Sequence, residues 1–159
     1  MKAKLTVFKT RWIVLFIALS SFFHASAQHA SGSSVENRIK NKNFVFVAQS
    51  VLPQRGVMRQ LTTYYDLRVS GDTLTGNLPY FGRAYTAPVD PSAGGLTFTS
   101  TSFDYLVNEG KKSRWEVQIK PDRSGNVQQL ILNVFDNNTA SLRVVSANRE
   151  PISFNGYIK

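Results

Sequence analysis

The chain contains no cysteine in its 159 residues and only two histidines. Without cysteine it has no disulfides, no thiolate chemistry and no N-terminal cysteine that could carry a lipid anchor. His24 falls within an expected signal segment, and His29 follows it in a stretch expected to be mobile. A Ser-His-Asp or Cys-His arrangement and a histidine-based metal site are therefore excluded.

Acidic residues are also few, ten in all, and they are spread singly along the chain. No Asp-x-Asp-x-Asp loop is present to bind calcium, and no glycine-rich loop is followed by a lysine and a helix to bind phosphate. We therefore expect no metal, no cofactor and no catalytic residue. A carboxylate pair could still hydrolyse a glycosidic bond. The candidates lie in or beside strands: Asp66, Asp104, Glu116 and Asp136. However, strand alternation places most of them on polar faces.

The N-terminal apolar run, Trp12–Phe23, has 12 residues, well short of the roughly 20 that span a bilayer. It follows the basic segment MKAKLTVFKTR and precedes the small residues ASA. This order is typical of a cleaved signal peptide. We expect a signal peptide at 1–27, a flexible leader at 28–33 and a single domain at 34–159. The mature protein should be periplasmic or secreted, not a lipoprotein, with no membrane span after cleavage.

Lysine and arginine outnumber acidic residues 19 to 10, which gives a net charge of +9. Four basic residues lie in the signal segment, so the remaining 132 residues carry +5, that is, 9 minus 4. These remaining charges are scattered, and export argues against a nucleic-acid partner. We expect solvated basic faces, with weak attraction to anionic envelope surfaces as a second interpretation.

One short helix is expected at about 34 to 41. Ser33 and Glu36 form a capping-box pattern, and Val35 and Ile39 give an apolar stripe four residues apart.

After Asn43 the pattern has period two. In LTTYYDLRV one face collects alternate residues and should be buried: Leu61, Thr63, Tyr65, Leu67 and Val69.

Turn residues divide this part of the chain into about nine short strands. Gly71-Asp72 predicts a two-residue hairpin turn, and Asn137-Asn138, which both tolerate positive φ, predict that the chain turns there as well. No helical pattern lies between the strands, so the sheet should be an antiparallel meander. Its edges must be closed or covered, which favours a small barrel over a tight sandwich.

The residues also carry a resemblance. The stretches that carry it are NFVFVAQSVLPQRGVMRQLTTYYDLRVSGDTLTGNLPYFGRAYTAPVDPSAGGLTFTSTSFDY, RWEVQIKP and LNVFDNNTASLRVVSANREPISFNGYI. Over about residues 34 to 158 the chain resembles exported Bacteroidetes proteins of the family known as domain of unknown function 4251. The resemblance implies an envelope protein with a lipocalin-like β-barrel. It implies no activity, so it assigns no functional residue.

The segment LPYFGRAY, residues 78 to 85, concentrates aromatic side chains around one arginine. If the preceding strand continues in register, Tyr80 and Ala84 face the core, while Phe81, Arg83 and Tyr85 face outward and can bind a planar or anionic group. A bulge at Pro79 would reverse these faces, and an inward arginine would then need a carboxylate such as Asp66 or Asp104. The loop at 86–95 follows, with a lid or binding loop as one interpretation.

We therefore expect an exported, non-enzymatic binding module whose barrel mouth contacts a small amphipathic molecule, with candidate ligand contacts at Tyr80, Phe81, Arg83 and Tyr85. The alternative is a structural or protein-interaction domain that binds another envelope protein. A carboxylate-pair hydrolase ranks third.

Export makes a direct prediction. The exported protein should be cut before Gln28 and carry no acyl group, because Ala25-Ser26-Ala27 fits a signal-peptidase site and no cysteine follows it. Intact mass spectrometry of the exported protein measures both properties. A product that retains residues 12 to 23, or that carries acyl mass, would contradict the prediction.

Overall fold

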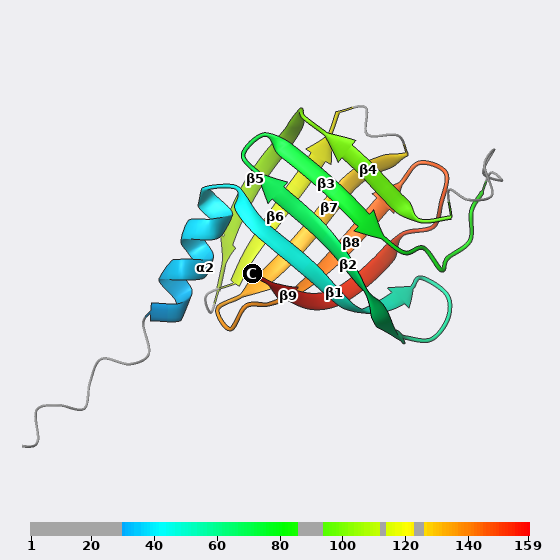
Figure 1. Cartoon of the computed structure of the whole chain (residues 1–159), viewed down its shortest axis with the longest axis horizontal. Coiled ribbons are helices and arrows are strands. Elements are labelled where there is room, and N and C mark those ends of the chain that lie inside the picture. The colour runs from blue at the N-terminus through cyan, green and yellow to red at the C-terminus, as the bar shows by residue number, and fades with distance from the viewer. Residues whose placement is uncertain (1–29, 86–93, 112–113, 123–125) are drawn as a thin grey trace, which may run out of the picture. The chain divides into compact units, whose positions relative to one another are not determined.

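The computed structural model describes residues 30–85, 94–111, 114–122 and 126–159. Ser31–Lys159 form one compact unit. Within the described residues, nine antiparallel strands make a single sheet that curls into a nearly closed barrel, with one short helix before the first strand (Figure 1). The predicted all-β meander closing into a small barrel, preceded by a short helix, is confirmed. The expected signal peptide and residues 28–29 of the expected leader lie outside the described residues, whereas residues 30–33 of that leader belong to the helix.

The elements follow one another with short connections. The helix α2 spans Ala30–Lys40, and the strands are β1 (Asn43–Pro53), β2 (Arg59–Ser70), β3 (Thr73–Leu78), β4 (Leu96–Ser100), β5 (Phe103–Gly110), β6 (Arg114–Pro121), β7 (Val127–Phe135), β8 (Thr139–Ser146) and β9 (Ile152–Ile158).

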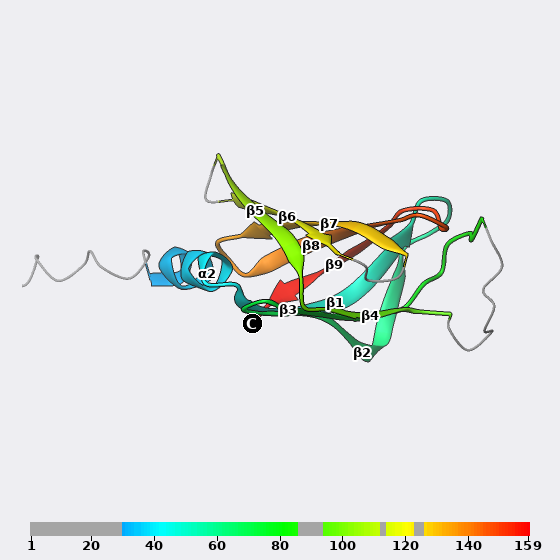
Figure 2. The same cartoon turned by 90° about the horizontal axis from the view of Figure 1, so that it is seen from above.

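Strands that are adjacent in the sheet are also consecutive in the chain, except at one place, where β1 pairs with β9. The consecutive strands β4 and β5 are the two ends of the sheet order. The order β4-β3-β2-β1-β9-β8-β7-β6-β5 therefore joins two meanders through the first and last strands. In Figure 2 the strands β1, β3 and β4 lie in one layer, and β6, β7 and β8 lie in the facing layer. The two layers enclose the core.

The tight turns have the backbone geometry that their residues predict. Gly71 has a φ of 57° in the two-residue turn between β2 and β3. Asn138 has a φ of 65° between β7 and β8, and the Asn137 Oδ1 atom accepts a hydrogen bond from the Thr139 amide at 3.1 Å. Glycine and asparagine tolerate this left-handed region better than other residues. Both turns are confirmed, and both fix the register of their hairpins.

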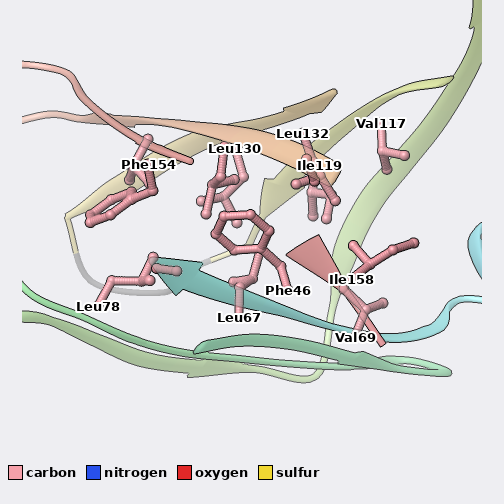
Figure 3. Close-up of a cluster of buried hydrophobic side chains, with 14 of the residues drawn as sticks. Phe46, Leu67, Val69, Leu78, Val117, Ile119, Leu130, Leu132, Phe154 and Ile158 are labelled. Carbon is pink, nitrogen blue, oxygen red and sulfur yellow. The ribbon is translucent and has the colours of Figure 1, made fainter. Parts of the chain in front are cut away.

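Apolar side chains from both layers fill the interior. Figure 3 shows Phe46, Leu67, Leu130 and Phe154 pointing into the space between the layers, and each is at most 2% exposed. Burying a side chain of this size contributes roughly 1.5–3 kcal/mol. Alternation predicted most of these inward positions, including Trp115, Val117 and Leu132, which are buried. In the described part of the chain, these side chains pack together in the space between the layers.

The alternation predicted for LTTYYDLRV is wrong at one position. Ala48 of β1 pairs with Tyr65, but Ser50 pairs with Gln60, so the segment 61–64 stands opposite the single residue Gln49. This large bulge releases Thr63 from the inward face, and Thr63 is exposed. A bulge inserts unpaired residues into one strand and shifts its facing pattern.

Two glycines are required by close packing. An alanine Cβ at Gly156 would run into the Val47 carbonyl oxygen, where β9 crosses β1. At Gly76, the Phe98 ring occupies the place that a Cβ would take. Glycine thus permits the close approach of strands and ring.

The helix α2 packs against the core through Val35 and Ile39, both fully buried. The predicted stripe is confirmed, but the helix begins at Ala30, so Ser33 lies within it rather than capping it. Arg38 Nη2 donates to the Asn138 side-chain oxygen at 2.6 Å. No helix among the described residues is long and apolar enough to cross a membrane.

Tyr105 of β5 holds the C-terminal turn of α2. Its hydroxyl donates to the Ile39 carbonyl at 2.8 Å, and the same carbonyl accepts from the Lys42 amide at 3.1 Å. Burial raises the pKa of Tyr105 well above its usual range, because the phenolate would be poorly solvated.

Replacing Tyr105 by phenylalanine tests this contact. Tyr105→Phe should lower the free energy of unfolding by about 1 kcal/mol near neutral pH, since the hydrogen bond is lost. The raised folded-state pKa stabilises the protein fully below the unfolded value, about 10, and this contribution is lost as the pH rises above it. The variant should therefore lose less stability than the wild type between about pH 9 and pH 11. Urea melts across this range measure both effects, with Tyr64→Phe, an exposed tyrosine, as the control. Equal pH dependence in both proteins would contradict the assignment.

Candidate functional site

Three connecting segments meet at one end of the barrel, away from α2 (Figure 1). They are the hairpin tip 54–58 between β1 and β2, the segment 79–85 after β3, and the segment 147–151 between β8 and β9. Pro53 pairs with Ile152, which brings the first and third segments together. We call this end of the barrel the loop end.

The segment 79–85 leaves the sheet because Leu78 ends the ladder with β4 and Pro79 has no amide proton to continue it. Its chain then runs antiparallel to the segment 147–151. The Tyr85 amide donates to the Asn148 carbonyl at 2.8 Å, and the Glu150 amide donates to the Arg83 carbonyl at 3.0 Å. The strand thus does not continue past Leu78, and Ala84, which a continued register would have placed inward, is exposed.

Tyr80 connects the two segments. Its Oη atom lies 2.7 Å from the Arg83 carbonyl oxygen and 3.1 Å from that of Glu150, so both accept from its hydroxyl. The Arg149 guanidinium lies over its ring, 5.0 Å from the centroid. Burial is the main cause that raises the pKa of Tyr80. Tyr80 thus fixes the backbone on which the neighbouring side chains stand.

Phe81, Arg83 and Tyr85 all face the solvent. Phe81 is 42% exposed and Tyr85 is 67% exposed, and Arg83 is exposed as well. The Arg59 guanidinium lies 5.4 Å from the Phe81 ring centroid, a cation–π distance that links β2 to this segment. We call these four residues, Arg59, Phe81, Arg83 and Tyr85, the aromatic–arginine face.

The outward position of Arg83 decides between the two alternatives left open by the sequence. An inward guanidinium would need a carboxylate partner to offset its desolvation. Asp66, one of the two suggested partners, instead lies 3.9 Å from Arg68 on its own strand. Asp104, the other, pairs in register with Lys120 on the neighbouring strand.

Sequence reasoning missed two charged residues at this end. Arg149 and Glu150 are only 8% and 7% exposed. Arg149 Nη1 donates to the carbonyls of Gly94 and Gly95 at 3.2 and 3.1 Å. Glu150 Oε1 lies 3.8 Å from Arg55 Nε. Buried charges are costly unless they are paired and hydrogen-bonded, so these residues tie the three segments together. These residues stand in the sequence Arg-Glu-Pro of a connecting segment, where no alternating pattern indicates which side chains are buried.

The carboxylates considered for hydrolysis are not paired by the sheet. Glu116 stands opposite Asn108 and Asn133, and its Oε1 accepts a hydrogen bond from Gln118. Asp66 stands opposite Val47 and Asn77. Among the described residues, no group of three or more His, Asp or Glu side chains could hold a metal ion. The segment 86–93, which contains most of the suggested lid, lies outside the described residues.

A cleft lies at the corner between β4 and β5. It is an open cleft of about 650 Å³ lined by Thr99, Ser100, Thr101, Ser102 and Asp122. Ser102 Oγ donates to Asp122 Oδ2 at 2.8 Å, and Ser100 Oγ donates to the Ser102 carbonyl at 2.6 Å. These bonds hold the corner through which β4 passes into β5. The described residues that line the cleft carry hydroxyl groups and one carboxylate.

Comparisons with known proteins agree with this architecture. The chain matches the model of the family described as Domain of unknown function (DUF4251) over residues 27–158, and it belongs to that family. The predicted family is thereby confirmed. A crystal structure of a DUF4251 family protein from Bacteroides eggerthii DSM 20697 is similar in fold, with a TM-score of 0.61 and 18% sequence identity. That match covers 80% of this chain and 86% of the other. No curated protein matches the chain.

The different environments of two arginines make a testable contrast. Arg83→Ala should change the free energy of unfolding by less than about 1 kcal/mol, because an exposed arginine contributes little to folding. Arg149→Ala should cost about 1.5–3 kcal/mol, because it removes the charged hydrogen-bond donor to the carbonyls of Gly94 and Gly95. Urea melts of the two variants measure the difference. A large loss for Arg83→Ala would place its side chain in the core.

Proposed function

We propose that this chain is a non-enzymatic binding module of the cell envelope, exported by the segment 1–27 and cut before Gln28. Its aromatic–arginine face contacts a small amphipathic molecule that carries an anionic group. The observation that carries this proposal is the exposure of Phe81 and Tyr85 beside Arg59 and Arg83. Large aromatic side chains are costly to leave in water, and clustered exposed ones mark binding surfaces.

The chemistry of this face fits an amphipathic molecule. Phe81 and Tyr85 offer ring surfaces to an apolar or planar portion, while the guanidinium groups of Arg59 and Arg83 can hydrogen-bond a carboxylate, sulfonate or phosphate. Arg59 already lies over the Phe81 ring, so a planar ligand could stack in the same manner.

The backbone beneath the face is preorganised. The Tyr80 hydroxyl and the two amide hydrogen bonds between the segments 79–85 and 147–151 hold it in one conformation. Binding a ligand on a fixed surface loses less conformational entropy than binding on a free loop. The filled interior supports the same location, because a barrel of about this strand number holds its own side chains or one small ligand.

The alternative is a structural or protein-interaction domain. It is favoured by the edge strand β5, where Leu106 is 55% exposed. Among the described residues, β5 pairs with β6 alone. An edge of this kind can accept a further strand. Saturable binding of a small amphiphile at the loop end distinguishes the leading proposal from this one.

Titration with 8-anilinonaphthalene-1-sulfonate, a planar anionic amphiphile, tests the leading proposal by fluorescence. The combined change Phe81→Ala and Tyr85→Ala should abolish saturable binding, and Arg83→Ala should weaken it about fivefold, as expected for the loss of about 1 kcal/mol. Phe135→Ala and Arg143→Ala serve as matched controls, since both residues are exposed on other strands. Equal weakening by the controls, or no saturable binding by the wild type, would overturn the proposal.

A further inference from the structure

We infer that the hairpin tip between β1 and β2 seats the barrel on an anionic lipid surface. The tip, residues 54–58, presents Val57 and Met58 to the solvent, 73% and 55% exposed. Neither side chain is part of the aromatic–arginine face. Exposed aliphatic side chains at a loop tip are typical of segments that insert into the headgroup region of a bilayer.

The hairpin tip turns at a glycine. Gly56 has a φ of 136°, which residues with a Cβ rarely adopt, and it directly precedes Val57. Figure 1 shows the hairpin at the same end as the segments 79–85 and 147–151. Of the eight large apolar side chains that are exposed in the described part of the chain, four lie in these segments: Val57, Met58, Phe81 and Tyr85. The exposed apolar surface is therefore concentrated at one end of the barrel.

The charge around the tip favours a negatively charged surface. In the described segments 53–59, 79–85, 94–95 and 147–151, four arginines accompany a single acidic residue, Glu150, a net charge of +3. Arg149 and Glu150 are both buried, and Glu150 faces Arg55, so the charges exposed at this end are those of Arg55, Arg59 and Arg83. Guanidinium groups bind phosphate oxygens through paired hydrogen bonds.

A lipid surface fits this arrangement better than a protein partner does. A bilayer offers anionic headgroups above an apolar layer, and the loop end offers both arginines and two exposed apolar side chains, Val57 and Met58. Each basic side chain that reaches such a surface strengthens binding about fivefold. The inference extends the proposed function, because a barrel bound to the bilayer would take its amphipathic ligand directly from it. In this respect alone it rests on the proposed function.

Sedimentation with vesicles tests the inference. The full mature chain should bind vesicles of phosphatidylcholine containing about one-third phosphatidylglycerol, and should bind pure phosphatidylcholine at least fivefold more weakly. The combined change Val57→Asp and Met58→Asp should abolish the binding, whereas Leu106→Asp, a change at an exposed position of β5, should leave it unchanged. Equal binding to both vesicle types, or no binding to either, overturns the inference.

Insertion can be measured without relying on a destabilising variant. Because the chain has no cysteine, Val57→Cys and Leu106→Cys each provide a single site for an environment-sensitive nitrobenzoxadiazole label. The label at position 57 should brighten when anionic vesicles are added, and the label at position 106 should not. No change at position 57, or the same change at both positions, would instead favour docking on a protein or by another face.

The two proposals can fail separately. The variant with Val57→Asp and Met58→Asp should still bind the soluble sulfonate probe, since it keeps the aromatic–arginine face. Vesicle binding without saturable probe binding would overturn the ligand site alone, and probe binding without vesicle binding would overturn the lipid surface alone.

Discussion

The pairing of β1 with β9 is the constraint on which the rest of the structure depends. It joins two meanders into one curled sheet and brings the two layers face to face around the core. The strands approach so closely that Gly156 has no space for a Cβ beside Val47. The same pairing places Pro53 opposite Ile152, which sets the hairpin tip beside the segment 147–151. The loop end is thus a product of closure, and its cluster of arginines follows from three connections meeting there.

Much of the fold could be predicted because local rules govern it. Period-two alternation identified the strands and most buried positions, and glycine or asparagine marked the turns, since these residues tolerate positive φ. The bulge at 61–64 could not be predicted, because Leu61, Thr63 and Tyr65 alternate in sequence as a regular strand would. Only the partner strand reveals that four residues oppose one. Likewise, the helix begins before the apolar stripe of Val35 and Ile39. No apolar repeat precedes that stripe, so the start of the helix could not be predicted.

The sequence predicted which segment forms the candidate site, but not which residues hold that segment in place. The density of aromatics in LPYFGRAY identified the segment, but Pro79 was interpreted as the site of a bulge rather than as the point where the ladder ends. The buried Arg149 and Glu150 could not be found, because their burial depends on the segments 79–85 and 94–95, which are far away in sequence. Tyr80 was predicted to contact the ligand, but its hydroxyl hydrogen-bonds backbone carbonyls. The positions of Arg149, Glu150 and Tyr80 depend on contacts between segments far apart in sequence, which local sequence patterns do not indicate.

The position of β9 in the sheet also bears on how the chain folds. Most ladders here join neighbours in sequence, which close short loops and form quickly. The pairing of Ala48 with Gly156 joins residues whose positions differ by 108, so it must overcome the entropy of a long loop. We therefore expect the two meanders to form first and the seam between β1 and β9 to close last. Until that moment both strands present unpaired edges, and this interval is when the chain is most exposed to aggregation.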